Sequence, residues 1–362
     1  MMLYFLPIVF LIVVLIPYLL NNFFLKKNLE EMDELLKFTK DKNFFLDKKN
    51  LSKKLVFIPH PYTNWTLNPH HKSHSNEVSH TNEGFRKVND DSSIFETIKK
   101  SKNKKKIICI GGSTTQCQEM TSYKYSWPSL LNKKLNNDKF QVFNFGVGGW
   151  GTGQSLARII YWVPTIKPDL IIFYQAKNDL TPFANIDKSI PDIHPDTQNS
   201  VVQYAQSFFF KFPRSLLLLP IFKLLYYFFF FKKNFIHFGL LNIYKPKPEQ
   251  NIEGLSRIKQ YHLDSIFLRI WKIFSLTKYY NCKLLYIPEI VLDGPYKNFL
   301  NEKIYPKIKN EISIDFENVS YQDITNLLEK DATNFLDKMH FSKQGNELFS
   351  DILKKRITEI YK

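Results

Sequence analysis

The chain has 362 residues, enough for one large domain or two smaller ones with a well-buried core. Its 12 glycines and 18 prolines are too few for a disordered protein. The formal net charge of +16 comes almost wholly from lysines spread along the chain, without the compact basic stripe of a nucleic-acid-binding surface. We therefore expect no nucleic-acid partner and attribute the charge to compositional bias, with attraction to anionic lipid or polysaccharide as the alternative.

Residues 3–20 form an almost continuous apolar run without a charge, about the length that crosses a bilayer as a helix. No basic residue precedes the run and no small-x-small cleavage pattern follows it, which favours an uncleaved anchor over a signal peptide. We expect residues 1–25 to be one N-terminal transmembrane helix. Lys26 and Lys27 follow it, and the positive-inside tendency alone would keep the rest of the chain in the cytoplasm.

Residues 26–103 separate this anchor from the predicted catalytic domain. Residues 26–55 are charged and mixed, and residues 56–90 are rich in Pro, His, Asn and Ser. We expect a spacer followed by irregular chain that wraps the domain.

Apolar, strand-like runs alternate with amphipathic stretches from residue 104 to the end of the chain. The alternation predicts an α/β fold with a mostly parallel sheet covered on both faces. The predicted strands are residues 107–110, 140–145, 169–175 and 284–287, with a weaker one at 319–324. The predicted helices are residues 123–135, 154–162, 256–280 and 343–361.

An aromatic and basic insertion at residues 181–255 interrupts this alternation. Within it, residues 215–231 are very apolar but contain Pro220 and Lys223. A second membrane span is disfavoured, because the run is short and the chain would have to return before the next strand. A helix that caps the domain and a helix that lies in the membrane interface both remain open.

Ser113 follows two glycines at the point where a strand should end and a helix begin. Glycines there allow a sharp turn, and the carboxyl ends of parallel strands are where open α/β folds bind ligands. The pattern differs from the G-x-S-x-G elbow, since residue 115 is Thr. Alone, such a serine is more often a turn or cap residue than a nucleophile.

His340 and Asp337 supply what a serine nucleophile needs. On a tight loop the three-residue spacing lets Asp337 face the imidazole Nδ1–H and leaves Nε2 free to accept the proton of Ser113. A metal-ligand pair is the lesser alternative, and no third ligand with suitable spacing is visible. The cysteines Cys109 and Cys282 form no ligand pair with Cys117 either, so we expect no metal.

Acyl transfer also needs hydrogen-bond donors for an oxyanion. The backbone amide of Gly149 and the side-chain amide of Asn178 both follow predicted strands and could provide them. Residues 146–151 also fit the dinucleotide fingerprint G-x-G-x-x-G. The acidic residue that should end the next strand is missing, so we expect no cofactor.

Together these motifs resemble those of the SGNH (GDSL-type) hydrolase superfamily over residues 104–362. The residues that match its four blocks are Gly111-Gly112-Ser113, Gly149, Asn178 and Asp337-x-x-His340. The resemblance implies a Ser113–His340–Asp337 triad and an oxyanion hole made of the Ser113 amide, the Gly149 amide and the Asn178 side chain. Two residues depart from the family pattern: Gly112 replaces the usual Asp, and Lys177 replaces the usual Gly.

The resemblance implies a flavodoxin-like three-layer α/β/α sandwich and either ester hydrolysis or acyl transfer. Pro61-Tyr62 and residues 82–86 are similar to a membrane-anchored bacterial subset of the superfamily. In such relatives the catalytic domain lies outside the cytoplasm, and we adopt this location against the two-lysine signal.

The leading functional hypothesis is a membrane-anchored serine esterase that removes acyl groups, for instance acetyl, from an envelope glycan or lipid. An O-acyltransferase that passes the acyl group to a polysaccharide hydroxyl would use the same triad and acyl-enzyme. A non-catalytic glycan-binding or assembly module is the alternative from another class, but it predicts the loss of a triad residue, and all three are present.

Overall fold

The computed structural model describes residues 56–60, 62–69, 71–72, 77–135, 139–185, 255–329 and 331–362. All of them belong to one compact unit that spans Asp47–Asp196 and Glu249–Lys362. The predicted anchor, the spacer to residue 55 and the apolar run 215–231 lie outside the described residues. Within the described ranges, no helix combines the length and apolarity that a membrane crossing requires.

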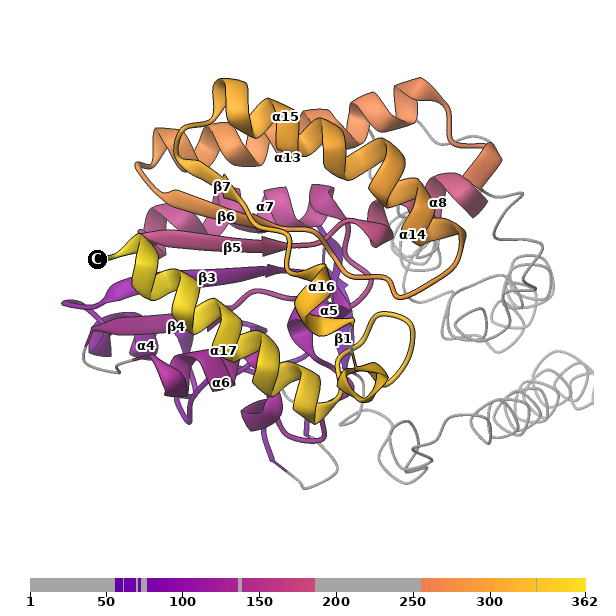
Figure 1. The fold of residues 1–362 in the computed structure, drawn as a ribbon. Coiled ribbons are helices and arrows are strands. Elements are labelled where there is room, and N and C mark those ends of the chain that lie inside the picture. Colours follow the sequence, from indigo (N-terminus) through magenta and orange to yellow (C-terminus); the bar gives the residue numbers. More distant parts are fainter. Residues whose placement is uncertain are drawn as a thin grey trace, which may run out of the picture. The chain divides into compact units, whose positions relative to one another are not determined.

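A five-stranded sheet forms the centre of this unit (Figure 1). Every neighbouring pair is parallel, and the spatial order is β4-β3-β5-β6-β7. The second strand along the chain therefore lies at one edge and the first lies beside it, which is the doubly wound order of flavodoxin-like folds. The strands are β3 (Lys105–Gly111), β4 (Phe140–Asn144), β5 (Leu170–Tyr174), β6 (Lys283–Ile287) and β7 (Val319–Tyr321).

Alternate side chains of each strand enter two separate apolar cores, as the pleat requires. In β3, Ile108 and Ile110 pack in one core, while Ile107 and Cys109 pack in the other. Helices cover both faces, so the strands are buried throughout and read as continuous apolar runs. The expected α/β fold with a parallel sheet is confirmed.

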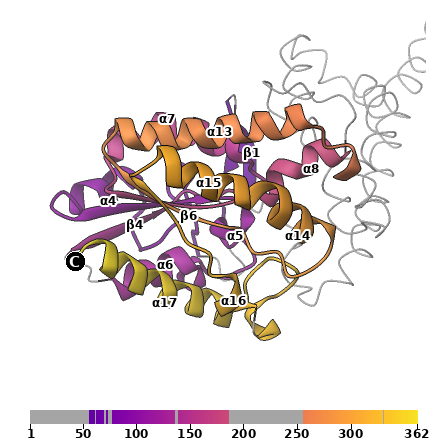
Figure 2. The same cartoon turned by 45° about the horizontal axis from the view of Figure 1, so that its top comes forward.

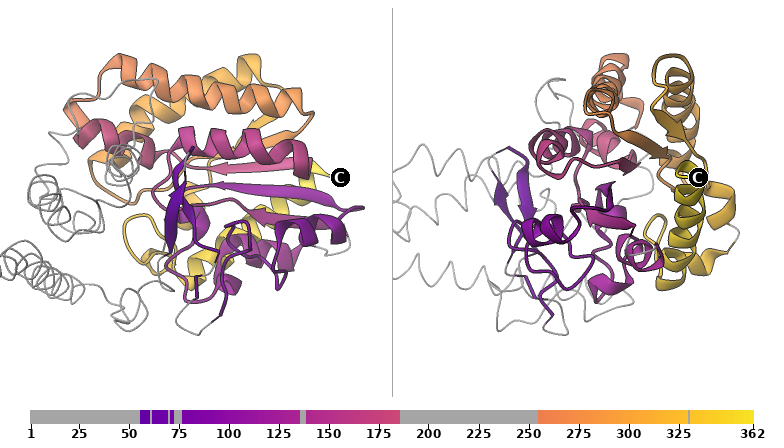
Figure 3. Two further views of the ribbon diagram at one scale, coloured as in Figure 1. Left: turned by 180° about the vertical axis from the view of Figure 1, so that it is seen from behind. Right: turned by 90° about the vertical axis from the view of Figure 1, so that its left-hand side faces the viewer.

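Figures 1 and 3 show these helices as layers above and below the sheet. One face carries α7 (Thr152–Ile166), α13 (Gln260–Tyr279) and α15 (Tyr305–Asp315), with α13 alongside α7 in Figure 2. The other face carries α6 (Trp127–Lys134) and α17 (Lys343–Ile360), which pack on each other. Shorter elements near the carboxyl ends of the strands are α5 (Ser113–Gln116), α8 (Lys177–Asn185), α14 (Pro295–Phe299), η5 (Leu300–Ile304), α16 (Thr325–Leu328) and η6 (Ala332–Asn334).

The segment before the sheet is more ordered than the sequence predicted. Instead of irregular chain throughout residues 56–90, it contains an antiparallel hairpin of β1 (Phe57–His60) and β2 (Asn64–Leu67). A short helix, α4 (Ile94–Lys100), follows it. Each hairpin strand has only four residues, too few for a clear alternating pattern, and the buried Trp65 shares a small apolar cluster with Val147 and Trp150.

The predicted helix at residues 123–135 is also interrupted. A single 3₁₀ turn, η2 (Tyr123–Tyr125), begins where the Ser122 hydroxyl accepts a hydrogen bond from the Lys124 amide. Ser126 is extended, and α6 begins only at Trp127. Pro128 fits the first turn of α6 because its missing N–H would have no helical partner there.

Candidate active site

The turn that carries Ser113 joins β3 to α5 at the carboxyl edge of the sheet (Figure 1). Ser113 is the first residue of α5, and 9% of its surface is exposed. A Cβ atom at Gly111 would collide with the Tyr174 carbonyl oxygen and the Thr115 hydroxyl. The glycine is therefore required for β3 to pass so close to β5 before the chain turns.

Ser113, His340 and Asp337 form one continuous hydrogen-bonded chain. The Ser113 Oγ lies 2.8 Å from His340 Nε2, and His340 Nδ1 lies 2.7 Å from Asp337 Oδ2. The other carboxylate oxygen, Oδ1, accepts hydrogen bonds from the Met339 and His340 amides, each 2.8 Å long. The loop before α17 thus holds Asp337 against the imidazole, as the three-residue spacing predicted.

The carboxylate and the imidazole shift each other's protonation. Burial opposes the ionisation of Asp337, but hydrogen bonds from the His340 ring and backbone outweigh it and lower the pKa of Asp337 to about 2. Burial also disfavours charge on His340, yet two carboxylates, Glu119 and Asp337, raise the pKa of His340 to about 9.

Glu119 is a member of this group that the sequence analysis did not identify. Its Oε1 lies 3.2 Å from His340 Nε2, the same nitrogen that faces Ser113, and its side chain is only 18% exposed. Burial raises the pKa of Glu119, while the nearby His340 opposes that rise. Glu119 lies in the loop after α5, where no residue spacing marks a carboxylate as a partner of a distant histidine.

The glycine-rich loop after β4 is held by side chains that bind its amides. The Gly146 amide donates to Asn144 Oδ1, and the Gly148 amide donates to Gln116 Oε1 at 2.6 Å. Gly149 has a φ of +78°, a conformation that favours glycine. Within the described ranges, neither the Gly149 amide nor the Ser113 amide has a hydrogen-bond acceptor, so both can serve an incoming oxyanion.

Asn178, in the first turn of α8, lies against the serine turn. Its Nδ2 donates to the Trp150 carbonyl oxygen at 3.1 Å. A Cβ atom placed on Gly112 would lie only 2.6 Å from this Nδ2. The structure therefore brings all four predicted motifs to one edge of the sheet, and a side chain at residue 112 would have to displace the Asn178 amide.

A second carboxylate that the sequence analysis missed, Glu289, connects two of these motifs. It is 2% exposed and follows β6. Its Oε1 accepts a hydrogen bond from the Thr114 hydroxyl at 2.8 Å, and its Oε2 accepts from the amides of Ala176 and Lys177 at 2.9 and 2.8 Å. One buried side chain thus fixes both the serine turn and the start of the helix that carries Asn178.

The β1–β2 hairpin supports the glycine-rich loop from outside. The Trp65 indole N–H donates to the Gly148 carbonyl oxygen at 2.9 Å, and the Trp150 indole N–H donates to the Trp65 carbonyl oxygen at 3.1 Å. The Trp65 ring would lie 3.2 Å from a Cβ atom on Gly149. Sequence analysis had no signal for this contact, because it joins segments more than 80 residues apart.

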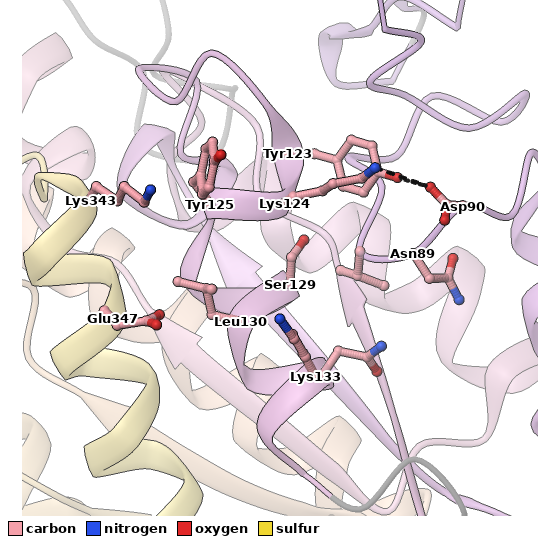
Figure 4. Close-up of a pocket in the computed structure, with 12 residues that line it drawn as sticks. Asn89, Asp90, Tyr123, Lys124, Tyr125, Ser129, Leu130, Lys133, Lys343 and Glu347 are labelled. Atoms are coloured by element: carbon pink, nitrogen blue, oxygen red, sulfur yellow. Dashed lines mark hydrogen bonds and ion pairs between the residues drawn. The ribbon is translucent and has the colours of Figure 1, made fainter.

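A separate hollow of about 540 Å³ lies between the start of α17, α6 and the η2 turn (Figure 4). Lysine and tyrosine side chains surround it. Lys343 Nζ lies 4.1 Å from the centre of the Tyr125 ring, and the Tyr123 hydroxyl donates to Asp90 at 2.5 Å. None of the predicted site residues lines this hollow.

For metal binding, the described part of the chain contains no group of three or more His, Cys, Asp or Glu side chains that could hold an ion. The fingerprint-like loop at residues 146–151 packs tightly on α5. A Cβ atom on Gly146 would collide with the Gln116 amide, and Gln116 also occupies the Gly148 amide. These glycines serve contacts within the protein.

No family model matches the chain, and no curated protein matches it. Several solved structures are similar to part of the chain. A lipolytic protein of the G-D-S-L family from Desulfitobacterium hafniense is 13% identical, covering 69% of this chain and 98% of its own, with a TM-score of 0.40.

An acetyl xylan esterase is also 13% identical, covering 70% of this chain and 99% of its own, with a TM-score of 0.43. An acylhydrolase from Bacteroides fragilis is 12% identical and covers 76% of this chain and all of its own, with a TM-score of 0.41. With TM-scores below 0.5, these similarities by themselves assign neither a family nor an activity to the chain.

Proposed function

We propose that the protein is a serine ester hydrolase that works through an acyl-enzyme on Ser113. The observation that carries the proposal is the continuous chain from Ser113 Oγ through His340 to the Asp337 carboxylate. An isolated serine at a turn needs no such chain. A base with an orienting carboxylate, aimed at a hydroxyl beside free backbone amides, has the parts that nucleophilic catalysis requires.

In the first half-reaction, His340 Nε2 takes the Ser113 proton as Oγ forms a bond to the ester carbonyl carbon. The negative charge that develops on the carbonyl oxygen is stabilised by the amides of Ser113 and Gly149 and by Asn178 Nδ2. Collapse of the tetrahedral intermediate breaks the bond to the alcohol oxygen. His340 returns the proton to that oxygen, and the alcohol leaves.

In the second half-reaction, water attacks the acyl-enzyme while Nε2 removes a proton from it. Collapse releases the carboxylic acid and restores the Ser113 hydroxyl. Throughout, Asp337 holds the Nδ1 proton of His340 and stabilises the imidazolium that forms twice in each cycle.

The proposed substrate is an acyl ester, acetyl in the simplest case, on a glycan or lipid of the cell envelope. The apolar run at residues 3–20 supports a membrane anchor, and the resemblance to anchored bacterial hydrolases supports a catalytic domain outside the cytoplasm. An anchored enzyme would act on esters held near the same membrane.

The test is to compare the purified protein with Ser113→Ala, His340→Ala and the double variant on an activated acetyl ester. Each single change should lower kcat by roughly a thousandfold or more, and the double variant should lose little beyond that, because the residues act as a unit. Asp337→Asn should cost less than the loss of Ser113. A fluorophosphonate should label the parent at Ser113 and leave Ser113→Ala unlabelled.

Additive losses, or a Ser113→Ala variant with full activity, would contradict the triad. Incubation with acetylated oligosaccharides then separates hydrolysis from transfer. Release of free acetate supports the esterase, whereas acyl transfer to added sugar in preference to water would replace it with an acyltransferase.

A further inference from the structure

One nitrogen of the candidate base faces two oxygens. His340 Nε2 lies 2.8 Å from Ser113 Oγ and 3.2 Å from Glu119 Oε1. The other ring nitrogen is committed to Asp337. An imidazole has two nitrogens, so a doubly protonated ring can satisfy both carboxylates at once, while a neutral ring can satisfy only one of them as a donor.

The two protonation states have opposite consequences for Ser113. When Nε2 carries a proton, it donates to Glu119 and cannot accept the Ser113 proton. When Nε2 is unprotonated, it can serve as the base, but an ionised Glu119 then faces a nitrogen lone pair at 3.2 Å. An ionised Glu119 therefore favours the state in which Ser113 is not activated.

The loop that carries Glu119 is held in place independently. The Arg86 guanidinium, which is 4% exposed, donates to the Met120 carbonyl oxygen at 3.1 Å. The charged groups around the pair are Asp337 from the loop before α17, Lys177 at the start of α8 and Arg86 from the segment before α4. Lys177 disfavours the protonated state of His340. Among these groups, only the carboxylates of Glu119 and Asp337 stabilise that state.

We propose that Glu119 is a positioning residue that keeps His340 protonated in the resting site and thereby sets the lower pH limit of the reaction. The kinetic consequence rests on the proposed function, whereas the contact between Glu119 and His340 does not depend on it. The His340 pKa of about 9, which Glu119 and Asp337 raise against the effect of burial, agrees with this role.

The kinetic test is the pH profile of kcat/KM for an activated acetyl ester, with spontaneous hydrolysis subtracted, in the parent and in Glu119→Gln and Glu119→Ala. This profile reports the free-enzyme pKa of the base. Removing the carboxylate should move the acid limb to lower pH by about one unit and raise kcat/KM at pH 7 about tenfold, while the high-pH plateau changes little. If Glu119 had only a structural role, its variants would show a lower high-pH plateau of kcat/KM and an acid limb at the parent's pH.

Glu77→Gln is the matched control. Glu77 is also an acid near Arg86, and it accepts a hydrogen bond from the Ser122 hydroxyl at 2.6 Å, but the structure records no contact between Glu77 and His340. The Glu77→Gln variant removes the same negative charge as Glu119→Gln and should leave the acid limb of the pH profile unshifted. An equal shift in Glu77→Gln would mean that net charge, not the contact, sets the limb, and would overturn the proposal.

A second measurement does not require turnover. The His340 ring signal, assigned by its loss in His340→Ala, is titrated by NMR in Ser113→Ala and in Ser113→Ala with Glu119→Gln. The midpoint should lie near 9 in the first protein and lower in the second. Equal midpoints would overturn the role of Glu119. A lower midpoint in a chain whose parent hydrolyses no ester would support the contact and count against the proposed function instead.

Discussion

At the scale of single residues, the space at position 112 is filled by another residue's side chain. The Asn178 amide nitrogen approaches to 2.6 Å from where a Gly112 Cβ would be. The absence of a side chain at residue 112 thus leaves room for the proposed third oxyanion donor. A side chain at residue 112 can enter only if that donor moves.

This contact makes a prediction about two variants. Asn178→Ala should lower kcat by roughly a hundred- to a thousandfold with little change in thermal stability, because an oxyanion donor is lost. Gly112→Ala should lose part of the same activity, since the added methyl group displaces the amide. The combined variant should resemble Asn178→Ala alone, because the methyl group then meets no amide.

Thr181→Ala is a matched control within the same helix. The Thr181 hydroxyl donates to the Lys177 carbonyl oxygen at 3.3 Å, so its loss perturbs α8 without touching the amide. This variant should keep its kcat. Strictly additive losses in Gly112→Ala and Asn178→Ala, or a loss of kcat in the control as large as in Asn178→Ala, would show that the amide is not the shared target.

The site residues that the sequence predicted lie beside regular elements, whereas those that it did not predict lie in irregular segments. Ser113, Asn178 and His340 each follow or precede a regular element, so local pattern placed them at the sheet edge. Glu119 contacts His340, and Glu289 contacts Thr114 and Ala176. Each of these partners lies more than 100 positions away along the chain. A carboxylate in an irregular segment carries no local sign of its partner, and only the folded chain identifies it.

At the scale of secondary-structure elements, the β1–β2 hairpin is part of the site's framework. It contributes Trp65, which contacts both the Gly148 carbonyl oxygen and the Trp150 indole. The segment expected to be an irregular wrapping thus supports the loop whose Gly149 amide has no acceptor among the described residues.

The Trp65→Phe variant should separate the effect of the indole hydrogen bond from the effect of the side chain's volume. A smaller phenyl ring still fills part of the space, but the donor to Gly148 is lost, so kcat should fall several-fold while the melting temperature falls less than in Trp65→Ala. Trp65→Ala should also destabilise the fold, by roughly 3–5 kcal/mol, because it removes a buried aromatic ring. Kinetics on an activated acetyl ester and thermal unfolding check both outcomes.

Trp162→Phe serves as the control for Trp65→Phe, since Trp162 lies on α7 and packs against Phe85 away from the glycine loop. Its kcat should stay at the parent value. If Trp65→Phe also kept full kcat, the indole hydrogen bond would be dispensable for the loop.

Four strands of the sheet were predictable because each is a short, largely apolar run, whereas β7 was only weakly marked and the helix limits were not predictable. The helix expected at residues 256–280 begins at Gln260, and β7 ends at Tyr321, before the expected residue 324. The helical stretch from α14 through α15 had no predicted counterpart at all. Its buried apolar residues Leu300, Ile304, Ile308 and Ile312 recur every four residues, so the sequence did contain the spacing of an amphipathic helix there.

At the scale of the whole molecule, the described unit has its own two large cores, built from described residues between Phe85 and Ile357. The predicted anchor at residues 3–20 and the apolar run at 215–231, which either caps the domain or lies in the membrane interface, fall outside the described residues. We therefore expect removal of residues 1–25 to leave a folded enzyme with the parent's activity on a soluble ester.

The truncated protein should still bind vesicles weakly if residues 215–231 lie in the membrane interface. Binding, measured by co-sedimentation, should rise with anionic lipid and fall with salt, because Arg214 and nearby lysines supply its electrostatic part. Replacing residues 228–231 with Ser should abolish it. If these residues cap the domain instead, the same replacement should lower the melting temperature. The protein lacking residues 1–25 should then not bind vesicles.

The distance along the chain between Ser113 and His340 has a consequence for biosynthesis. The two residues are 227 positions apart, and Asp337 and His340 lie in the last loop before the final helix. During translation the serine turn is therefore made long before its base exists. A nascent chain that still lacks His340 carries an unactivated serine, so we expect the proposed hydrolytic activity to arise only after this loop has been synthesised and α17 has packed onto α6.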